Sequence, residues 1–104
     1  MEIVLQKFID DLLSRYAPRD HEEFVILLER NESIVGEIIE AAKSDYNVHF
    51  SESIQDGWYC IDQGNENYKV YHQERGRLGW GEKILAGKCN AITEVLKASC
   101  YLRI

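Results

Sequence analysis

Between residues 57 and 84 the chain alternates apolar and polar side chains, and this alternation limits the fold more than any other sequence feature. The stretch reads GWYCIDQGNENYKVYHQERGRLGWGEKI. Successive side chains of a strand point to opposite faces of a sheet, so Trp58 and Cys60 share one face while Tyr59 takes the other. The tract 64–67, with its Gly and Asn residues, suits a hairpin turn. We therefore predict a three-stranded antiparallel meander.

Two sets of side chains alternate along the second strand of this meander. One set is Tyr68, Val70 and His72, and the other is Lys69, Tyr71, Gln73 and Arg75. The second set is richer in polar atoms, so we expect it to be the more exposed. Gly76 permits the next reversal. Because both faces carry aromatic residues, the sheet is either covered twice, or covered once with a face left for a partner.

Three segments before the meander repeat their apolar residues at helical spacing, so we predict three N-terminal helices. The first covers residues 2–16 and is broken at Pro18, which cannot donate to a helical ladder. Asp20 begins the second helix, and Glu23 follows at the spacing of a capping box. This second helix contains the apolar run 24–28. We predict that it is the most buried of the helices.

The third helix is predicted from an apolar stripe formed by Ile34, Val35, Ile38, Ile39 and Ala42. Residues 44–56 keep no period and are expected to be a connection, in which 48–50 is a candidate for a short edge strand. A last amphipathic helix from Lys88 to Leu102 should pack on one sheet face. Residues 1–104 thus form a single domain with an α+β fold: three N-terminal helices, a three-stranded antiparallel meander and a C-terminal helix on the sheet.

Charge is divided unevenly along this chain, whose net charge is −6. Residues 1–56 hold 5 Lys and Arg against 13 Asp and Glu, whereas residues 57–104 hold 7 against 5. An acidic surface repels nucleic acid and attracts basic proteins. It also keeps a small protein soluble, with no partner required. Composition leaves both interpretations open.

The residues that could carry chemistry do not form a recognisable motif. The chain has Cys60, Cys89, Cys100, His21, His49 and His72. Their spacing predicts neither a disulfide framework nor a zinc site, and favours reduced, buried thiols in a cytosol. A pair of Cys60 with His72 lacks an oxyanion hole, and the glycines of RGRLGWGEK match no phosphate-binding loop. We therefore expect no enzyme, no metal and no cofactor.

Nucleic acid and membrane are also unexpected partners. A modest basic and aromatic cluster could bind single strands, and it comprises Arg75, Arg77, Lys83, Lys88, Tyr71 and Trp80. The acidic total argues against that function. No apolar run approaches the ~20 residues of a membrane span, and the first residues lack a cleavage pattern, so we expect a cytoplasmic protein.

The meander and the last helix resemble the small bacterial immunity proteins that neutralise contact-dependent growth inhibition toxins or other polymorphic toxins. The resemblance covers about half of the chain and rests on the pattern YxVYxxERG, here running from Tyr68 to Gly76, ahead of a third strand and a closing helix. It implies an immunity protein that binds a cognate toxin domain, a basic nuclease, and occludes its active site. Such an inhibitor needs no turnover.

In that function, acidic side chains would mimic the phosphates of the toxin's substrate, and aromatic residues of the sheet would anchor the complex. The expected partner-binding residues are Glu37, Glu40, Asp45, Glu52, Asp56, Trp58, Tyr59 and Tyr71. The alternative is a small cytoplasmic adaptor or regulatory domain that binds another protein, or itself, through an uncovered sheet face. Gene order discriminates between the two, because an immunity gene should directly follow a toxin reading frame. The sequence leaves the oligomeric state open.

Overall fold

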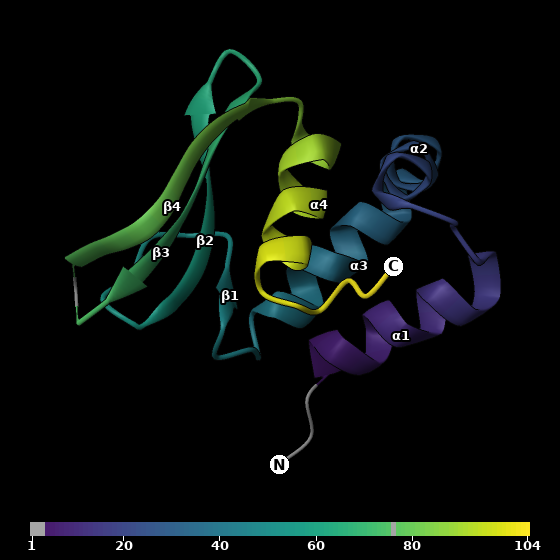
Figure 1. Ribbon diagram of the computed structural model, residues 1–104, viewed down its shortest axis with the longest axis horizontal. Coiled ribbons are helices and arrows are strands. Elements are labelled where there is room, and N and C mark those ends of the chain that lie inside the picture. The colour runs from purple at the N-terminus through teal and green to yellow at the C-terminus, as the bar shows by residue number, and fades with distance from the viewer. Residues whose placement is uncertain (1–3, 76) are drawn as a thin grey trace.

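The computed structural model describes residues 4–75 and 77–104, and over these residues four helices lie on one side of a sheet (Figure 1). The elements follow the order α1 (Val4–Tyr16), α2 (His21–Arg30), α3 (Glu32–Ala42), β1 (Val48–His49), β2 (Gly57–Gly64), β3 (Asn67–Glu74), β4 (Arg77–Ala86) and α4 (Lys88–Ala98). The α+β class, the three N-terminal helices and the C-terminal helix on the sheet are confirmed, but α4 ends at Ala98, short of the predicted Leu102, because the chain takes a positive φ of 67° at Cys100. Gly76, where we predicted a reversal, lies outside the described residues.

The sheet in the described part of the chain has four strands and mixed pairing, so the predicted three-stranded antiparallel sheet is wrong. Its strand order is β1-β2-β3-β4, and β1 runs parallel to β2 while the other pairs are antiparallel. The added strand is only Val48 and His49, at the place where the sequence suggested a short edge strand. Two residues are too few to show an alternation, so the pattern that revealed the meander could not reveal β1.

Side-chain and backbone contacts hold this short strand in place. The carboxylate of Asp45 accepts hydrogen bonds from the backbone N–H groups of Asn47 and Val48, each at 2.9 Å. The N–H of Trp58 donates to the carbonyl oxygen of Asn47 at 2.7 Å. Gly57 has a φ of +135°, and a Cβ atom there would lie 2.9 Å from the Asn47 oxygen. The close approach of β1 to β2 therefore requires glycine at this position.

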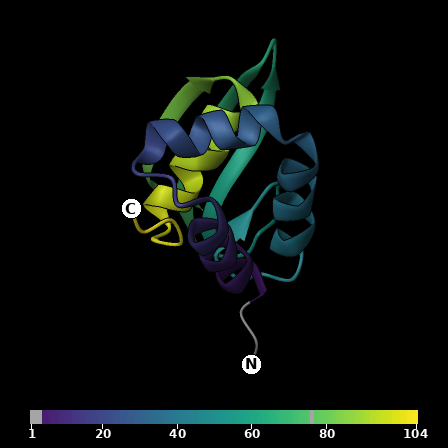
Figure 2. The same cartoon turned by 90° about the vertical axis from the view of Figure 1, so that its right-hand side faces the viewer.

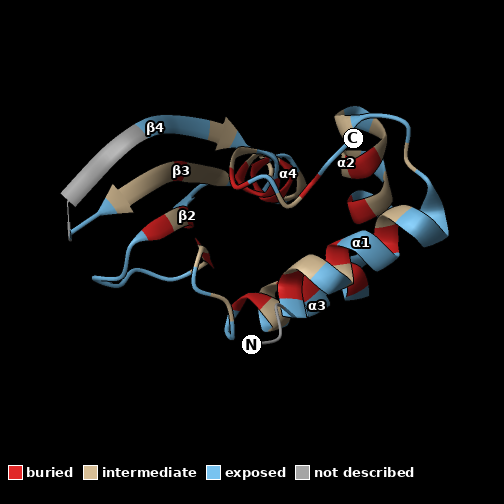
Figure 3. Cartoon of the chain, turned by 60° about the horizontal axis from the view of Figure 1, so that its bottom comes forward, coloured by how far each residue is buried: buried red, intermediate tan, exposed pale blue. Residues whose placement is uncertain are grey.

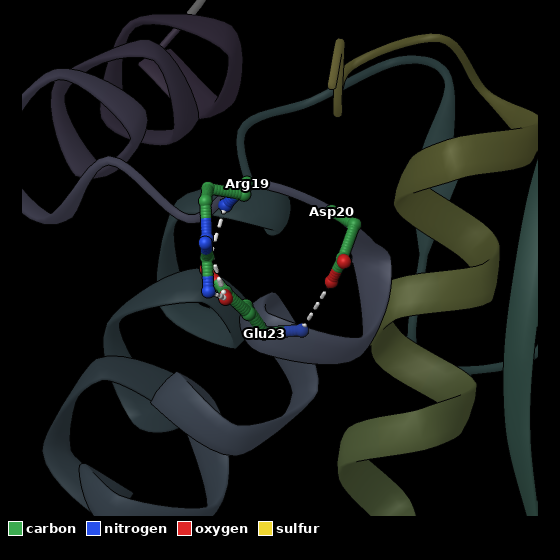
Figure 4. Close-up of polar contacts among 3 residues, drawn as sticks. All are labelled: Arg19, Asp20 and Glu23. Carbon is green, nitrogen blue, oxygen red and sulfur yellow. Dashed lines mark hydrogen bonds and ion pairs between the residues drawn. The ribbon is translucent and has the colours of Figure 1, made fainter.

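The second helix begins with one of the two bonds of a capping box (Figure 4). Asp20 Oδ1 accepts a hydrogen bond from the backbone N–H of Glu23 at 2.8 Å, as predicted. The Glu23 carboxylate instead accepts from the backbone N–H of Arg19 at 2.8 Å and from its guanidinium at 2.9 Å. This hydrogen bonding by Arg19 lowers the pKa of Glu23. Asp20 therefore fixes the first turn of α2, and Glu23 fixes the chain that enters it.

The core lies between the helices and the face of the sheet that carries Cys60 and Val70 (Figure 3). α4 packs on β2, β3 and β4, while α1 packs against α3 and α2 against α4. Val70 is 1% exposed, whereas Tyr71 on the other face is half-buried. The predicted faces of the second strand of the meander are therefore confirmed.

α2 is not the most buried helix, contrary to our prediction. All ten of its residues are described, and among them Phe24 and Leu28 are buried, whereas α4 buries five. Ile26 keeps 41% of its surface exposed. Figure 2 shows α2 on the outside of the helical layer, crossing α4, so its neighbours cover one side of it only. An apolar run predicts burial only where the fold supplies a second covering element.

The three cysteines are free thiols at different depths. The expected burial is confirmed for Cys60, but Cys100 is exposed, and there the expectation is wrong. Burial raises the pKa of Cys60 to about 12. Among the described residues, no group of three potential metal ligands occurs, and no helix has the length and apolar character that crossing a membrane requires.

Iodoacetamide is expected to alkylate Cys100 in the native protein and to leave Cys60 unmodified. The thiolate is the reactive species, and burial suppresses it at Cys60. Mass spectrometry of proteolytic peptides measures both sites, with denatured protein as the control in which both thiols react. Alkylation of Cys60 as fast as Cys100 under native conditions would show that the β2 thiol is accessible.

Candidate partner-binding surface

The segment 50–56, here called the β1–β2 loop, lies against the sheet face that points away from the helices. Tyr59 and Gln73 reach it from that face. The Tyr59 hydroxyl lies 2.7 Å from Ser53 Oγ and donates to the carbonyl oxygen of Gln55 at 2.5 Å. The Gln73 side-chain amide donates to the carbonyl oxygens of Ser53 and Gln55 at 2.8 and 3.0 Å. Two strands thus tether the middle of the loop.

The end of the loop is tethered as well, through Asp56. Its Oδ1 accepts a hydrogen bond from the backbone N–H of Arg75 at 2.6 Å. Its carbonyl oxygen lies 3.1 Å from Nε2 of His49, which belongs to β1. The loop is therefore fixed by contacts to β1, to β2 and to residues in and just after β3, and it forms one rigid unit with the sheet edge.

A row of aromatic rings underlies this loop. His49, Tyr59 and Tyr71 come from three adjacent strands, with ring centroids 4.7 Å apart for the first pair and 5.2 Å for the second. Lys69 Nζ lies 5.2 Å from the centroid of the Tyr71 ring and 3.2 Å from the carboxylate of Glu82. Tyr59 in the middle of the row has no exposed surface. The row therefore supports the loop from below.

The loop displays an aliphatic side chain to solvent. Ile54 is 87% exposed, the highest value among the large hydrophobic residues that the structure describes. Its neighbours Ser53 and Gln55 are the tethered residues, and Glu52 is exposed beside them. A loop whose backbone is held in place before binding loses less conformational freedom when a partner covers it. This geometry is typical of a contact residue and unlike that of a flexible solvent-exposed loop.

A pocket of about 340 Å³ separates this loop from α3. Ile39 of α3 and Lys43, the residue that caps its C-terminal end, line one wall, and Ser51 and Ser53 of the loop line the other. Asp45 in the connection between them also lines the pocket. The pocket is therefore mixed in character, with apolar, hydroxyl and charged groups. It has room for one side chain of a partner.

Two carboxylates belong to α3, the helix that lines this pocket through Ile39, but neither of them lines the pocket itself. Glu37 and Glu40 are exposed, and Glu40 forms an ion pair with Lys43 at 3.0 Å. Glu37 has no ion pair among the described residues. Both partners of the Glu40–Lys43 pair are largely exposed, so solvent screens it and the carboxylate stays available to a cation.

The acidic residues that the sequence singled out divide into two groups. The exposed group is Glu37, Glu40, Glu52 and Asp56. Asp45 is half-buried, and besides the N–H groups that hold β1 its carboxylate accepts a hydrogen bond from the Tyr101 hydroxyl at 2.9 Å. Burial and this bond raise the pKa of Tyr101. Asp45 thus joins β1 to the C-terminal segment, and its oxygens are already occupied.

The aromatic residues of the predicted site lie on different faces of the sheet. Trp58 packs against the core on the helix side, and its ring contacts His72 at a centroid distance of 5.1 Å. Tyr59 and Tyr71 lie on the other face, where Tyr71 alone keeps exposed surface. Ile54 was missed because it stands in a segment without a period, although an isoleucine among Ser, Glu, Gln and Asp was a visible signal.

Of the basic and aromatic cluster considered for nucleic acid, the side chains of Arg77 and Trp80 lie outside the described residues. Lys83 pairs with Glu94 of α4 at 2.7 Å, and Lys69 pairs with Glu82. The surface of the β1–β2 loop and α3 instead combines an exposed isoleucine, a pocket and carboxylates. Comparison of the chain with protein-family models, with curated proteins and with solved structures finds no match in any of the three.

Proposed function

We propose that this chain is an immunity protein that binds a cognate bacterial toxin domain, a basic nuclease, and occludes its active site. The observation that supports this most is Ile54, an almost fully exposed isoleucine on a loop whose backbone is tethered on both sides of it. Binding energy in protein interfaces concentrates in a few well-placed side chains. Ile54 has the placement of such an anchor.

The carboxylates of the loop and of α3 indicate that the partner's surface is positively charged. Glu52 and Asp56 flank Ile54 in the loop, and Glu37 and Glu40 extend the negative charge onto α3. Exposed carboxylates attract a surface that normally binds phosphates, such as the substrate groove of a nuclease. The pocket between the loop and α3 has room for one side chain of the partner beside the Ser51 and Ser53 hydroxyls.

Inhibition in this mechanism is stoichiometric and depends on exclusion. The loop would lie over the toxin's substrate groove, Ile54 would be buried at the centre of the contact, and the carboxylates would occupy the positions of substrate phosphates. No bond is made or broken. The inhibitor needs only a rigid surface, which the tethers from Tyr59 and Gln73 provide.

The decisive experiment is co-expression with the product of the reading frame directly upstream. The expected result is a one-to-one complex on size-exclusion chromatography and loss of the nuclease activity of that product. An upstream product that forms no complex with this chain, or that is neutralised without forming one, would refute the proposal.

Reversal of Glu37 and Glu40 to Lys is expected to slow association with this partner about tenfold at low salt. The effect should shrink as salt is raised, because exposed charges are screened beyond about 8 Å at physiological ionic strength. Stability should change by about 0.5 kcal/mol or less, since both side chains are exposed. Stopped-flow fluorescence at several salt concentrations measures the rate.

The matched control reverses Glu22 and Glu29 of α2, which are also exposed, and it changes the net charge by the same amount. α2 and the loop lie towards opposite ends of the molecule (Figure 1). Equal slowing in the two double variants would mean that the total charge steers the partner and that α3 has no special part.

A further inference from the structure

The exposed side of α2 forms a second surface of a different kind. A groove of about 520 Å³ runs between α2, α4 and the end of β4. Val25 and Ile26 of α2 and Leu85 of β4 supply its apolar lining. On the other side of α2 lies a hollow of about 470 Å³, lined among others by Tyr16 and again by Ile26. Ile26 therefore lies between the groove and the hollow. Together with Val25, Leu85 and Tyr16 on its two sides it forms what is here called the apolar strip.

The fold leaves two large side chains of this strip partly uncovered. Tyr16 is 45% exposed and Ile26 41%. Ile26 lies on the side of α2 opposite to Phe24, which is part of the core, and Tyr16 is the last residue of α1, one turn beyond the buried Leu12. Adjacent exposed apolar residues on a small protein mark a surface that another molecule covers.

The charges beside the strip indicate what that molecule is. Glu22 and Glu29 line the groove from α2, are exposed, and form no ion pair among the described residues. Glu94 on the α4 wall is paired with Lys83 at 2.7 Å, and Lys97 is the cation of the lining. The side of the groove next to Ile26 therefore presents two carboxylates that form no ion pair among the described residues, and these carboxylates would attract cationic groups of a partner.

The spacing of these carboxylates favours a helix as the occupant. Glu22 and Glu29 are seven residues apart, which places them two turns apart, about 10 Å along the axis and on the same side of α2. Lys or Arg residues seven apart on a second helix have the same separation. Such a helix, lying along α2, would put its apolar stripe onto Val25, Ile26 and Leu85, the apolar lining of the groove.

We infer that the α2–α4 groove binds a cationic amphipathic helix of a second protein, at a site separate from the β1–β2 loop. α2 crosses the outside of α4, so a helix can approach it without moving any element of the fold (Figure 2). The loop surface lies towards the other end of the molecule (Figure 1). The two sites can therefore be occupied together.

A synthetic peptide of Leu and Lys provides the probe. A peptide of about 18 residues, with a leucine stripe and Lys seven apart beside it, is titrated into the full ¹⁵N-labelled chain and followed by NMR. Shifts confined to α2, α4 and the end of β4 are expected. A peptide of the same composition with a scrambled order, which loses the stripe, should bind at least tenfold more weakly.

Two pairs of variants locate the contact. Glu22→Gln with Glu29→Gln is expected to weaken the peptide at least tenfold, whereas Glu32→Gln with Glu37→Gln on α3 makes the same charge change and should have little effect. Ile26→Lys should abolish binding, while Val4→Lys, at a helical residue with 44% exposure, should not. Thermal unfolding checks that each variant is folded.

Several outcomes would overturn the inference. These are equal binding of the scrambled peptide, shifts spread over α3 and the sheet, equal weakening by the two Gln pairs, and self-association of the chain that Ile26→Lys removes. Ile54→Ala should leave the titration unchanged, so a failure here is distinguishable from a failure of the loop as the toxin-binding surface.

Discussion

Replacement of Gly57 by alanine is expected to lower the free energy of unfolding by about 3 kcal/mol or more. Its φ of +135° belongs to a region that residues with a Cβ atom rarely adopt. The added Cβ would also lie 2.9 Å from both the Asn47 carbonyl oxygen and His49 Nε2. Relief of these clashes moves β1 away from β2 and breaks the bond from the Trp58 N–H to Asn47.

Urea denaturation followed by circular dichroism measures this loss. Gly36→Ala is the matched control, because Gly36 lies inside α3 and a Cβ atom there would meet nothing within 4 Å. That exchange should stabilise the protein by about 0.5–1 kcal/mol, since alanine favours the helix more. An unchanged unfolding midpoint for Gly57→Ala would mean that β1 is not held as described.

If this chain binds a toxin as proposed, truncation of Ile54 to alanine is expected to raise the Kd for that toxin about 30-fold, or about 2 kcal/mol. Most of the change should appear as faster dissociation, because a central anchor acts after encounter. The free energy of unfolding should hardly change, since 87% of the side chain already faces solvent. Surface plasmon resonance with purified toxin domain gives both rates.

Ile26→Ala on α2 is the matched control, an exposed isoleucine outside the loop that should leave the Kd for the toxin unchanged.

Tyr59→Phe tests the tether separately. It removes the hydroxyl that holds Ser53 and Gln55, at a residue with no exposed surface that cannot touch the toxin itself. Loss of these bonds is expected to reduce the free energy that favours the ordered loop by about 1–2 kcal/mol. Dissociation should therefore again be faster.

Toxin that binds the Ile54→Ala variant as tightly as the parent chain would remove the loop from the interface. Faster dissociation for Ile54→Ala together with parent-like kinetics for Tyr59→Phe would support contact between Ile54 and the toxin. The same result would contradict the claim that the Tyr59 hydrogen bonds preorganise the loop for binding. The pair of variants therefore separates contact from preorganisation.

Local patterns in the sequence determined where most elements lie. The helical spacing in 2–16, 24–28 and 34–42 predicted α1, α2 and α3, and Asp20 was recognised as the cap that begins α2. The alternation between 57 and 84 predicted the antiparallel strands and the two faces of β3. These predictions held because a period is a relation among near neighbours, and the backbone geometry of helix and strand acts over the same short distance.

Only the tertiary structure decided which of these surfaces are covered. α2 carries the apolar run 24–28, yet Ile26 stays exposed because no described helix or strand packs on the outer side of that helix. Tyr59 stands in an ordinary alternating strand, yet the β1–β2 loop buries it completely. The same period is compatible with burial or exposure, since burial depends on what another part of the chain places over that face.

The candidate site depended most on such distant contacts. Asp45 was indistinguishable in sequence from the exposed carboxylates, and its hydrogen bond to Tyr101, 56 positions further along, makes it a structural residue. The loop that displays Ile54 is held by bonds from Gln73, 20 positions from Ser53, to a segment with no period of its own. Periodicity carries no information about hydrogen bonds between residues so far apart, so the sequence determined the helices and the meander, whereas the folded chain alone decided how the loop is held and what it displays.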